Sequence, residues 1–435
     1  MAELIVLLEE RIAGRLAFEN NRLSFTYDEA WRTAPDAYPL SLSMPLVVSR
    51  HAHAAADAFI WNLLPDNERT LDRWARQFQV SARNPFALIG AVGEDCAGAV
   101  QFVRPERLDT VRARDRIDIR WLDDAEIGAR LRSVATEAAT GRTAGENGQF
   151  SLAGAQPKTA LLLDGDRWGV PAGRTPTTHI LKPPARDLPG HAENEHFCLN
   201  LARELGLRAA RSTVRAFDGQ PTIVVERYDR RHLGGSGPEH LVRVHQEDMC
   251  QALGVVPWKK YQSDGGPDPA GLLRLIQARV ASPTTDGRPA ERPAERDRWL
   301  FVDALILNWL IAGTDAHAKN YSLLIGSAGT VRLAPLYDIA SAFGVPDLQR
   351  QRMKLAMKIE YYRLDQIRRR HWERWAGTAG VDPGAVIARI DTMARAMPDA
   401  VARVAARVRA DGLDHPVIDM VERVLPERAL AVIGD

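Results

Sequence analysis

Residues 298–313, RWLFVDALILNWLIAG, would carry apolar side chains on nearly every face if they formed a helix. A helix that is apolar all round is buried on most of its sides, because none of its faces is suited to water. A chain of 435 residues is long enough to enclose such a helix, and this length predicts two or three structural units. We therefore expect the helix to lie inside a largely helical part of the fold.

Strand signals dominate the chain before this helix. Short β-prone runs within residues 4–27 predict a small sheet, because charged or Asn-containing turns separate them. Two later segments, KTALLLDGDRWGV and RAFDGQPTIVVERY, each place an Asp-Gly turn between β-prone runs and so predict hairpins. Between the hairpins lie a predicted strand, THILKP, and a predicted amphipathic helix, ENEHFCLNLARELG. Residues 151–230 are therefore predicted to form a small sheet that carries one helix.

Helical patterns flank this sheet on both sides. Residues 123–140 are predicted to be helical, and residues 141–149 have the Gly, Thr and Asn content of a loop. Beyond about residue 245 the chain is mostly helical, but the Pro-rich segment 282–296 is expected to form an exposed loop. The predicted parts are an N-terminal subdomain with a small sheet and helices, a sheet-rich part and a helical C-terminal part, at residues 1–150, 151–245 and 246–435.

Composition and charge limit the classes of function. The formal net charge is +1, so the chain has no overall positive field that would attract nucleic acid or anionic lipid. Three widely spaced cysteines are too few for a disulfide framework, which is typical of a reducing compartment. The first ten residues lack the cationic leader of a secretory signal, and no apolar run approaches the roughly 20 residues of a membrane span. We expect a cytoplasmic protein that does not bind membranes.

The segment after the apolar helix carries two carboxylates and a carboxamide. Asp315 and Asn320 have the D-x-x-x-x-N spacing of a kinase catalytic loop, and Asp338 follows a short predicted hairpin. Phosphoryl transfer requires a carboxylate that orients the attacking hydroxyl and oxygen ligands for Mg²⁺. The spacing alone is weak evidence, because Asp and Asn side chains that cap ordinary loops produce it more often.

Three features upstream occur in the order that a kinase would need. Lys182 lies in the predicted strand HILKP, where a lysine that contacts nucleotide phosphates is expected. The small-residue segment SLAGAQPK, residues 151–158, could bring backbone N–H groups close to phosphate. The end of the second hairpin, residues 224–229, occupies the place of an adenine-binding hinge. Taken singly, these features are also compatible with an exposed-strand lysine, a plain turn and an amphipathic edge strand.

Taken together, these motifs resemble the HipA family, the serine/threonine kinase toxins of HipA–HipB type II toxin–antitoxin modules. The resemblance covers nearly the whole chain and implies an α+β, protein-kinase-like two-lobed fold, with an additional small β-containing N-terminal subdomain and a mostly helical C-terminal lobe. The blocks that carry it are PLSLSMPL, NLLPDNER, SLAGAQPKTALL, TPTTHILKPP, NEHFCLNLARELGL, VERYDRR, QEDMCQALG, YQSDGGP, TDAHAKNYS and LAPLYDIASAF.

The resemblance implies ATP and Mg²⁺ as cofactors and assigns roles to residues. Asp315 would be the catalytic base, and Lys182 would contact the ATP phosphates. Asn320 and Asp338 would be the Mg²⁺ ligands. Further ATP contacts would come from the phosphate loop, the hinge and the segment QEDM, at Ala153, Gly154, Ala155, Gln156, Lys158, Glu226, Tyr228 and Gln246.

Regulation is implied by the same resemblance. Ser151 matches the serine that HipA kinases autophosphorylate, which ejects the phosphate loop and inactivates the enzyme. Pro157 departs from the family pattern, where glutamate is expected, and it removes one N–H donor from the loop. His317 would either orient Asp315 or bond to a backbone carbonyl, and a structural role is the more common one for such a histidine.

The implied partners are a HipB-like helix-turn-helix antitoxin, operator DNA bound through that antitoxin, and a protein substrate, glutamyl-tRNA synthetase. In the antitoxin complex the protein would be associated with the nucleoid. Arg368, Arg369 and Arg370 could contact DNA phosphates, although a solvated helix face explains them equally well. Two alternatives remain open, a small-molecule phosphotransferase and a non-catalytic pseudokinase that acts as a co-repressor.

Overall fold

The computed structural model describes residues 2–113, 117–135, 151, 153–154, 156–183, 189–279, 293–345 and 352–434. The chain forms two compact units, each built from segments that are distant in sequence. The first unit comprises residues 1–183, 215–258 and 323–330, and the second comprises 184–214, 259–322 and 331–435. This division concerns compactness in space, so the three consecutive parts proposed from the sequence stay a prediction.

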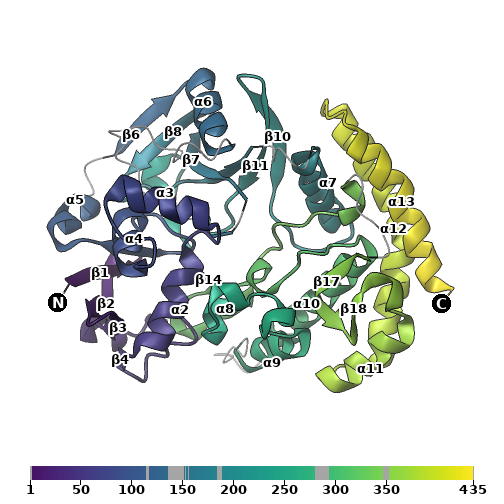
Figure 1. Cartoon of the computed structure of the whole chain (residues 1–435), viewed down its shortest axis with the longest axis horizontal. Coiled ribbons are helices and arrows are strands. Elements are labelled where there is room, and N and C mark those ends of the chain that lie inside the picture. The colour runs from purple at the N-terminus through teal and green to yellow at the C-terminus, as the bar shows by residue number, and fades with distance from the viewer. Residues whose placement is uncertain are drawn as a thin grey trace. The chain divides into compact units, whose positions relative to one another are not determined.

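The first unit begins with a five-stranded antiparallel sheet in the order β4-β3-β2-β1-β5. Figure 1 labels strands β1 to β4 of this sheet. The strands expected within residues 4–27 are therefore confirmed. Strand β1 lies between β2 and β5 and is buried from Leu4 to Leu8. Its Ile5 and Leu7 pack with Val111 of α5, while α2 packs on β3 and α4 on β5. The elements of this part are β1 (Ala2–Leu8), β2 (Arg11–Glu19), β3 (Arg22–Tyr27), α1 (Glu29–Arg32), β4 (Arg50–His51), α2 (His53–Leu63), α3 (Glu68–Phe78), α4 (Pro85–Val92), β5 (Val100–Val103) and α5 (Leu108–Arg112).

A six-stranded sheet in the order β10-β11-β9-β7-β8-β6 follows in the same unit. Both predicted hairpins are confirmed, and Gly165, Asp218 and Gly219 in their turns have the positive φ angles that such tight turns require. The elements are β6 (Asp118–Leu122), α6 (Asp124–Ala135), β7 (Thr159–Asp164), β8 (Arg167–Ala172), β9 (His179–Lys182), β10 (Ser212–Phe217), β11 (Gln220–Glu226), β12 (Arg230–His232), β13 (Leu241–Arg243), β14 (Gln246–Asp248), α8 (Met249–Leu253) and β15 (Ser322–Ile325).

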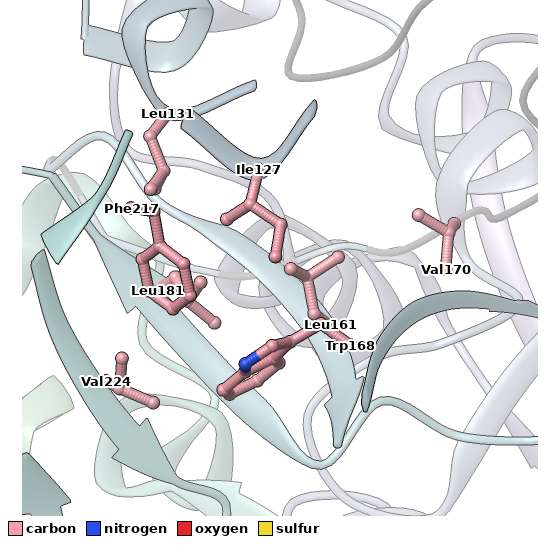
Figure 2. Packing of buried hydrophobic residues seen from close by; sticks show 8 residues of the cluster. All are labelled: Ile127, Leu131, Leu161, Trp168, Val170, Leu181, Phe217 and Val224. Carbon is pink, nitrogen blue, oxygen red and sulfur yellow. The ribbon is translucent and has the colours of Figure 1, made fainter. Parts of the chain in front are cut away.

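Helix α6 covers one face of this sheet. Ile127 and Leu131 of the helix pack on Leu161, Leu181 and other side chains of the strands (Figure 2). Successive residues of a strand point to opposite faces, so Lys182, next to the core residue Leu181, lies on the face away from α6. The lysine is thereby excluded from the apolar core of its own sheet.

The second unit is mostly helical. Its elements are α7 (His191–Glu204), α9 (Pro269–Arg279), α10 (Pro293–Leu310), β16 (Val331–Leu333), β17 (Lys354–Ile359), β18 (Tyr361–Arg363), α11 (Arg369–Ala379), α12 (Pro383–Ala410) and α13 (Pro416–Ile433). The long helix α12 packs along α13 (Figure 1). The apolar helix expected from the sequence is α10, and its side chains from Phe301 to Leu310 are buried except at Asp303. None of the described helices is long and apolar enough to cross a membrane.

Two predicted segments, the loop at residues 282–296 and the helix at residues 123–140, differ from the structure or lie partly outside the described residues. Of the loop expected at residues 282–296, residues 282–292 lie outside the described residues, and the last four are helical, because α10 begins at Pro293. Proline is favourable in the first turn of a helix, where its missing N–H has no partner to lose, and Glu295 pairs with Arg298 one turn later. The helix expected at residues 123–140 is described only as Asp124–Ala135, and the predicted loop 141–149 lies outside the described residues.

Candidate active site

The segment after α10 forms a closed turn between Asp315 and Asn320, in the second unit. The backbone carbonyl of Asp315 accepts hydrogen bonds from the N–H of His317 at 2.8 Å and from Nδ2 of Asn320 at 2.9 Å. The N–H of Asn320 donates in turn to the carbonyl of His317 at 2.9 Å. The five-residue spacing seen in the sequence is therefore the spacing at which the Asn320 amide reaches back to the Asp315 backbone.

The Asp315 carboxylate is exposed, and its Oδ1 accepts a hydrogen bond from the hydroxyl of Tyr261 at 2.6 Å. Sequence reasoning did not identify Tyr261 as a site residue. The available signal was its position at the start of the block YQSDGGP, which marked the family resemblance without a role.

His317 is buried, and its ring packs edge-on against Tyr261 with the ring centres 5.0 Å apart. Burial lowers the pKa of His317 to about 4, so the ring is neutral near pH 7. Its Nδ1 has no hydrogen-bond partner among the described residues. Nδ1 of the ring therefore bonds neither to Asp315 nor to a backbone carbonyl in the described part of the chain, and the catalytic role considered for His317 stays a prediction.

Asp338 has a φ of 58°, in the left-handed region that non-glycine residues rarely adopt. The hydroxyl of Tyr337 donates to the carbonyl of Lys319 at 2.6 Å and lies 2.6 Å from Oγ of Ser322. The side chain of Tyr337, the residue before Asp338, thus contacts Lys319, which precedes Asn320, and Ser322, which follows it. On the other side, the N–H of Ser341 donates to Oδ1 of Asn194 on α7 at 3.0 Å.

The donor set of this segment is suited to a hard cation. Asn320 uses its amide nitrogen on the Asp315 backbone, which leaves the amide oxygen for another partner. Asp338 offers an exposed carboxylate. Among the described residues no group of three or more His, Cys, Asp or Glu side chains could hold a metal ion. Two oxygen ligands are nonetheless sufficient for Mg²⁺ in nucleotide sites, where phosphates and water complete the shell.

The expected nucleotide-binding residues lie in the first unit. In the β9–β11 pair, Ile223 lies opposite Lys182 and Glu226 lies opposite His179. After Glu226, which is exposed, the N–H of Arg227 donates to the carbonyl of Thr178 at 2.9 Å. The Tyr228 hydroxyl then donates to Oε1 of Gln246 at 2.5 Å, so two of the predicted residues are in direct contact.

The segment around Ser151 is docked against the N-terminal part of the same unit. Ser151 is fully buried, its Oγ donates to the carbonyl of Leu63 at 2.7 Å, and its N–H donates to the carbonyl of Asp95 at 2.9 Å. The carbonyl of Gly154 accepts from the N–H of Asp66 at 3.3 Å. These contacts join segments far apart in sequence.

The rest of this segment folds over itself. Nζ of Lys158 donates to the carbonyl of Ala153 at 2.6 Å, and a Cβ at Gly154, whose φ is 105°, would lie 2.5 Å from that ammonium. Gln156 and Pro157 are half-buried, whereas Ala155 lies outside the described residues. Glycine at position 154 thus allows Lys158 to approach the loop backbone closely.

A buried charge network surrounds Asp95 and was not foreseen from the sequence. The Asp95 carboxylate contacts Arg230 at 2.8 Å, Arg243 at 3.2 Å and Arg227 at 3.5 Å, and Asp229 pairs with two of these arginines. Burial by itself would raise the pKa of the Asp95 carboxyl, but the arginines hold that pKa well below its usual range. Since Asp95 also accepts the N–H of Ser151 through its carbonyl, one residue contacts both Arg227 and Ser151.

The three arginines proposed to contact DNA make intramolecular contacts. Arg368 donates to the carbonyls of Asp365 and Ile367, and Arg369 forms an ion pair with Asp391. Nε of Arg370 lies 3.4 Å from Nε2 of His371. Arg369 thus pairs with a carboxylate, whereas Arg370 is exposed, and DNA binding by these arginines stays a prediction.

Comparisons with known proteins agree across both units. The family models of the HipA N-terminal domain and the HipA-like C-terminal domain match residues 4–103 and 150–401. A Sinorhizobium fredii protein named as a kinase, Y4mE, is 37% identical over 91% of this chain and 90% of its own. The Shewanella oneidensis serine/threonine-protein kinase toxin HipA is 28% identical over 91% of this chain and 88% of its own.

A solved structure extends this similarity to the fold. The Shewanella oneidensis HipA, HipB and operator DNA complex contains a chain with a TM-score of 0.80 and 25% identity, covering 99% of this chain and 97% of that one. The predicted α+β, kinase-like fold class is confirmed, and the class of protein is that of HipA-like kinase toxins. The chain belongs to the HipA family.

Proposed function

We propose that this protein is a Mg·ATP-dependent serine/threonine protein kinase that acts as the toxin of a type II toxin–antitoxin module. The observation that carries the proposal is the turn in which Asn320 holds the backbone of Asp315 and leaves the Asp315 carboxylate exposed to a substrate hydroxyl. The similarity to a serine/threonine-protein kinase toxin over 91% of the chain supports the same reaction.

In the proposed mechanism the serine oxygen of the substrate bonds to the γ-phosphorus of ATP while Asp315 accepts the proton of that hydroxyl. ADP is the leaving group. Lys182 contacts the ATP phosphates together with the loop from Ala153 to Lys158, while Glu226, Tyr228 and Gln246 bind near adenine. Asn320 and Asp338 would hold Mg²⁺, which supplies charge neutralisation for the phosphates. The direct Tyr228–Gln246 contact would orient both side chains before the nucleotide binds.

Inactivation through Ser151 has a physical basis in the buried position of this residue. Its hydroxyl donates to the carbonyl of Leu63 and its side chain has no exposed surface, so phosphorylation requires the segment to leave this position. A phosphoserine carries a charge of about −1.5 to −2 and cannot donate the same hydrogen bond, so it would not return to the buried position. We therefore expect autophosphorylation to keep the phosphate loop undocked and the kinase inactive.

The proposed partners are a HipB-like helix-turn-helix antitoxin and, through it, operator DNA. The related Shewanella structure is a complex of HipA with HipB and its operator DNA. A net charge of +1 gives this chain no general affinity for DNA, so the antitoxin would supply most of it, with Arg368, Arg369 and Arg370 adding phosphate contacts. The protein would then be cytoplasmic when free and nucleoid-associated in the complex.

The proposed substrate is glutamyl-tRNA synthetase, whose phosphorylation would arrest translation and growth. The test is transfer of labelled phosphate from Mg·ATP to this synthetase by wild type, Asp315→Asn and Asp166→Asn, the last removing an exposed turn carboxylate as a control. Loss of the base should lower the rate by roughly 10²- to 10⁴-fold, whereas the control should match wild type.

The outcomes separate the proposal from its alternatives. Equal rates for wild type and Asp315→Asn would reject Asp315 as the base. ATP consumption with metabolites as acceptors, and none with proteins, would indicate a small-molecule phosphotransferase. Binding of ATP or antitoxin without any transfer would indicate a pseudokinase co-repressor.

A further inference from the structure

The two parts of Asp315 are held in different ways. Its backbone is fixed by two hydrogen bonds to its carbonyl, from His317 and Asn320, within the same turn. Its carboxylate is exposed, and among the described residues its hydrogen-bond donor is the hydroxyl of Tyr261, at 2.6 Å. An O–H···O⁻ distance of about 2.5–2.7 Å is typical of a charge-assisted hydrogen bond. The orientation of this carboxylate therefore depends on a residue outside the catalytic loop.

Tyr261 is itself held by a tightly wound turn. Its carbonyl accepts hydrogen bonds from the N–H of Asp264 at 3.1 Å and of Gly266 at 3.0 Å. A Cβ at position 266 would lie 2.0 Å from the Lys259 carbonyl oxygen, so this close winding requires glycine. The next residue, Gln262, accepts the N–H of Lys358 on β17 through its side chain at 2.8 Å, which attaches the turn to a strand.

The turn also contacts the catalytic loop at two further points. The Tyr261 ring packs against the buried ring of His317 at an interplanar angle of 84°. The N–H of Ala318 lies 3.4 Å from the carbonyl oxygen of Lys260 as a weak hydrogen bond. Consequently the Tyr261 phenol has a fixed position relative to the Asp315 backbone, as a group that orients another side chain must have.

We propose that Tyr261 is a positioning residue for the catalytic base. This inference rests on the proposed kinase function and adds a residue to it. The phenol O–H donates to Oδ1 and restricts the rotation of the carboxylate, which leaves Oδ2 as the acceptor for the substrate hydroxyl. Tyr261 touches neither nucleotide nor phosphate in this account, so it changes the rate of transfer and leaves nucleotide affinity unaffected.

The test uses the full chain with Mg·ATP and measures the rate of autophosphorylation as a function of ATP concentration. Tyr261→Phe removes the hydroxyl and keeps the ring that packs on His317. We expect its maximal rate to fall roughly 10- to 100-fold, the range expected for losing one hydrogen bond to a charged group, at an unchanged half-saturating ATP concentration. Incorporation of p-aminophenylalanine at position 261 retains a donor at the same place and should restore most of the rate.

Tyr362→Phe provides the matched control, because Tyr362 lies on the β18 strand of the same unit and makes no hydrogen bond to Asp315. The inference is overturned if wild type is active but the maximal rate of Tyr261→Phe stays within about twofold of the wild-type rate. Such a change is smaller than the loss of one hydrogen bond to a charged group would cause. It is also overturned if the loss appears mainly in the half-saturating ATP concentration, or if the amino analogue restores nothing. In these cases the kinase proposal stands, whereas absence of transfer by wild type would reject both.

Discussion

At the scale of single residues, Asn320 holds the backbone of Asp315, and Tyr261 holds its carboxylate. The D-x-x-x-x-N pattern marked Asp315 and Asn320, and the turn that joins them explains the spacing. Tyr261 could not be found in the same way, because it lies 54 positions from Asp315. No local sequence pattern indicates a hydrogen bond between residues so far apart. His317 was noticed for its position, but its ring contact with Tyr261 depends on how the two segments fold together.

Substitutions at Ser151 test whether the buried serine controls activity. Ser151→Ala loses one hydrogen bond, which costs about 1 kcal/mol, and it should keep the segment docked and phosphorylate glutamyl-tRNA synthetase without self-inactivation. Ser151→Asp places a carboxylate where no surface is exposed, so the segment should undock and activity should fall. Time courses of transfer to the synthetase measure both effects.

Ser133→Asp is the control for the added charge, since Ser133 lies on α6 outside this segment. If Ser151→Asp transferred phosphate as fast and as long as Ser151→Ala, the buried hydroxyl would have no part in the control of activity.

At the scale of elements, short-range signals predicted the strands and helices, and their docking could not be predicted. The Asp-Gly turns marked both hairpins, and the all-round apolar pattern marked α10. The Asp95 network could not be predicted from the sequence, because its arginines lie 132, 135 and 148 positions away from Asp95. Alternating charge in a sequence does not indicate which charged side chains are buried. The hydrogen bond of Ser151 to Leu63 could not be predicted either, because the two residues lie 88 positions apart.

The Asp95 network should be essential for the stability of the first unit. Asp95→Asn leaves three buried guanidinium groups with one carboxylate, and breaking a buried ion pair in this way costs about 3–5 kcal/mol of the free energy of unfolding. Urea denaturation measures the change.

Glu204→Gln removes an ion pair with Arg403 and Arg407, whose side chains are 58% and 45% exposed, so it should cost less than about 1 kcal/mol. Equal effects of the two substitutions would show that the Asp95 network contributes no more than a surface ion pair.

At the scale of the whole molecule, each compact unit is assembled from separate stretches of chain, which composition and local pattern cannot foresee. The second unit, for example, takes α7 from the middle of the sheet-rich region. Length predicted two or three units, and the family resemblance implied the fold class. Neither indicated which segments of the chain would belong to which unit.

Acid should destabilise the molecule through its buried histidines. Burial lowers the pKa of His179, His196, His245 and His317 to about 4, from 6.5 in an unfolded chain. Between these values the unfolded state binds more protons, so the stability is fully present above pH 6.5 and is lost as the pH falls towards 4. Each histidine contributes up to about 1.4 kcal/mol per pH unit in this range.

Thermal unfolding between pH 7 and pH 4 checks this prediction. His196→Gln should make the pH dependence shallower, whereas substitution of the exposed His232 by Gln should leave it unchanged. A midpoint that stays constant over this range would contradict the account.

The most direct test of the kinase account is to incubate purified wild type and Asp315→Asn with Mg·ATP and to map phosphorylated residues by peptide mass spectrometry. We expect phosphate on Ser151 in wild type and none in the variant, because transfer needs the base and Ser151 is the acceptor within the chain. Absence of phosphate from wild type, despite measurable ATP binding, would contradict the kinase account, and so would equal phosphorylation of the two proteins.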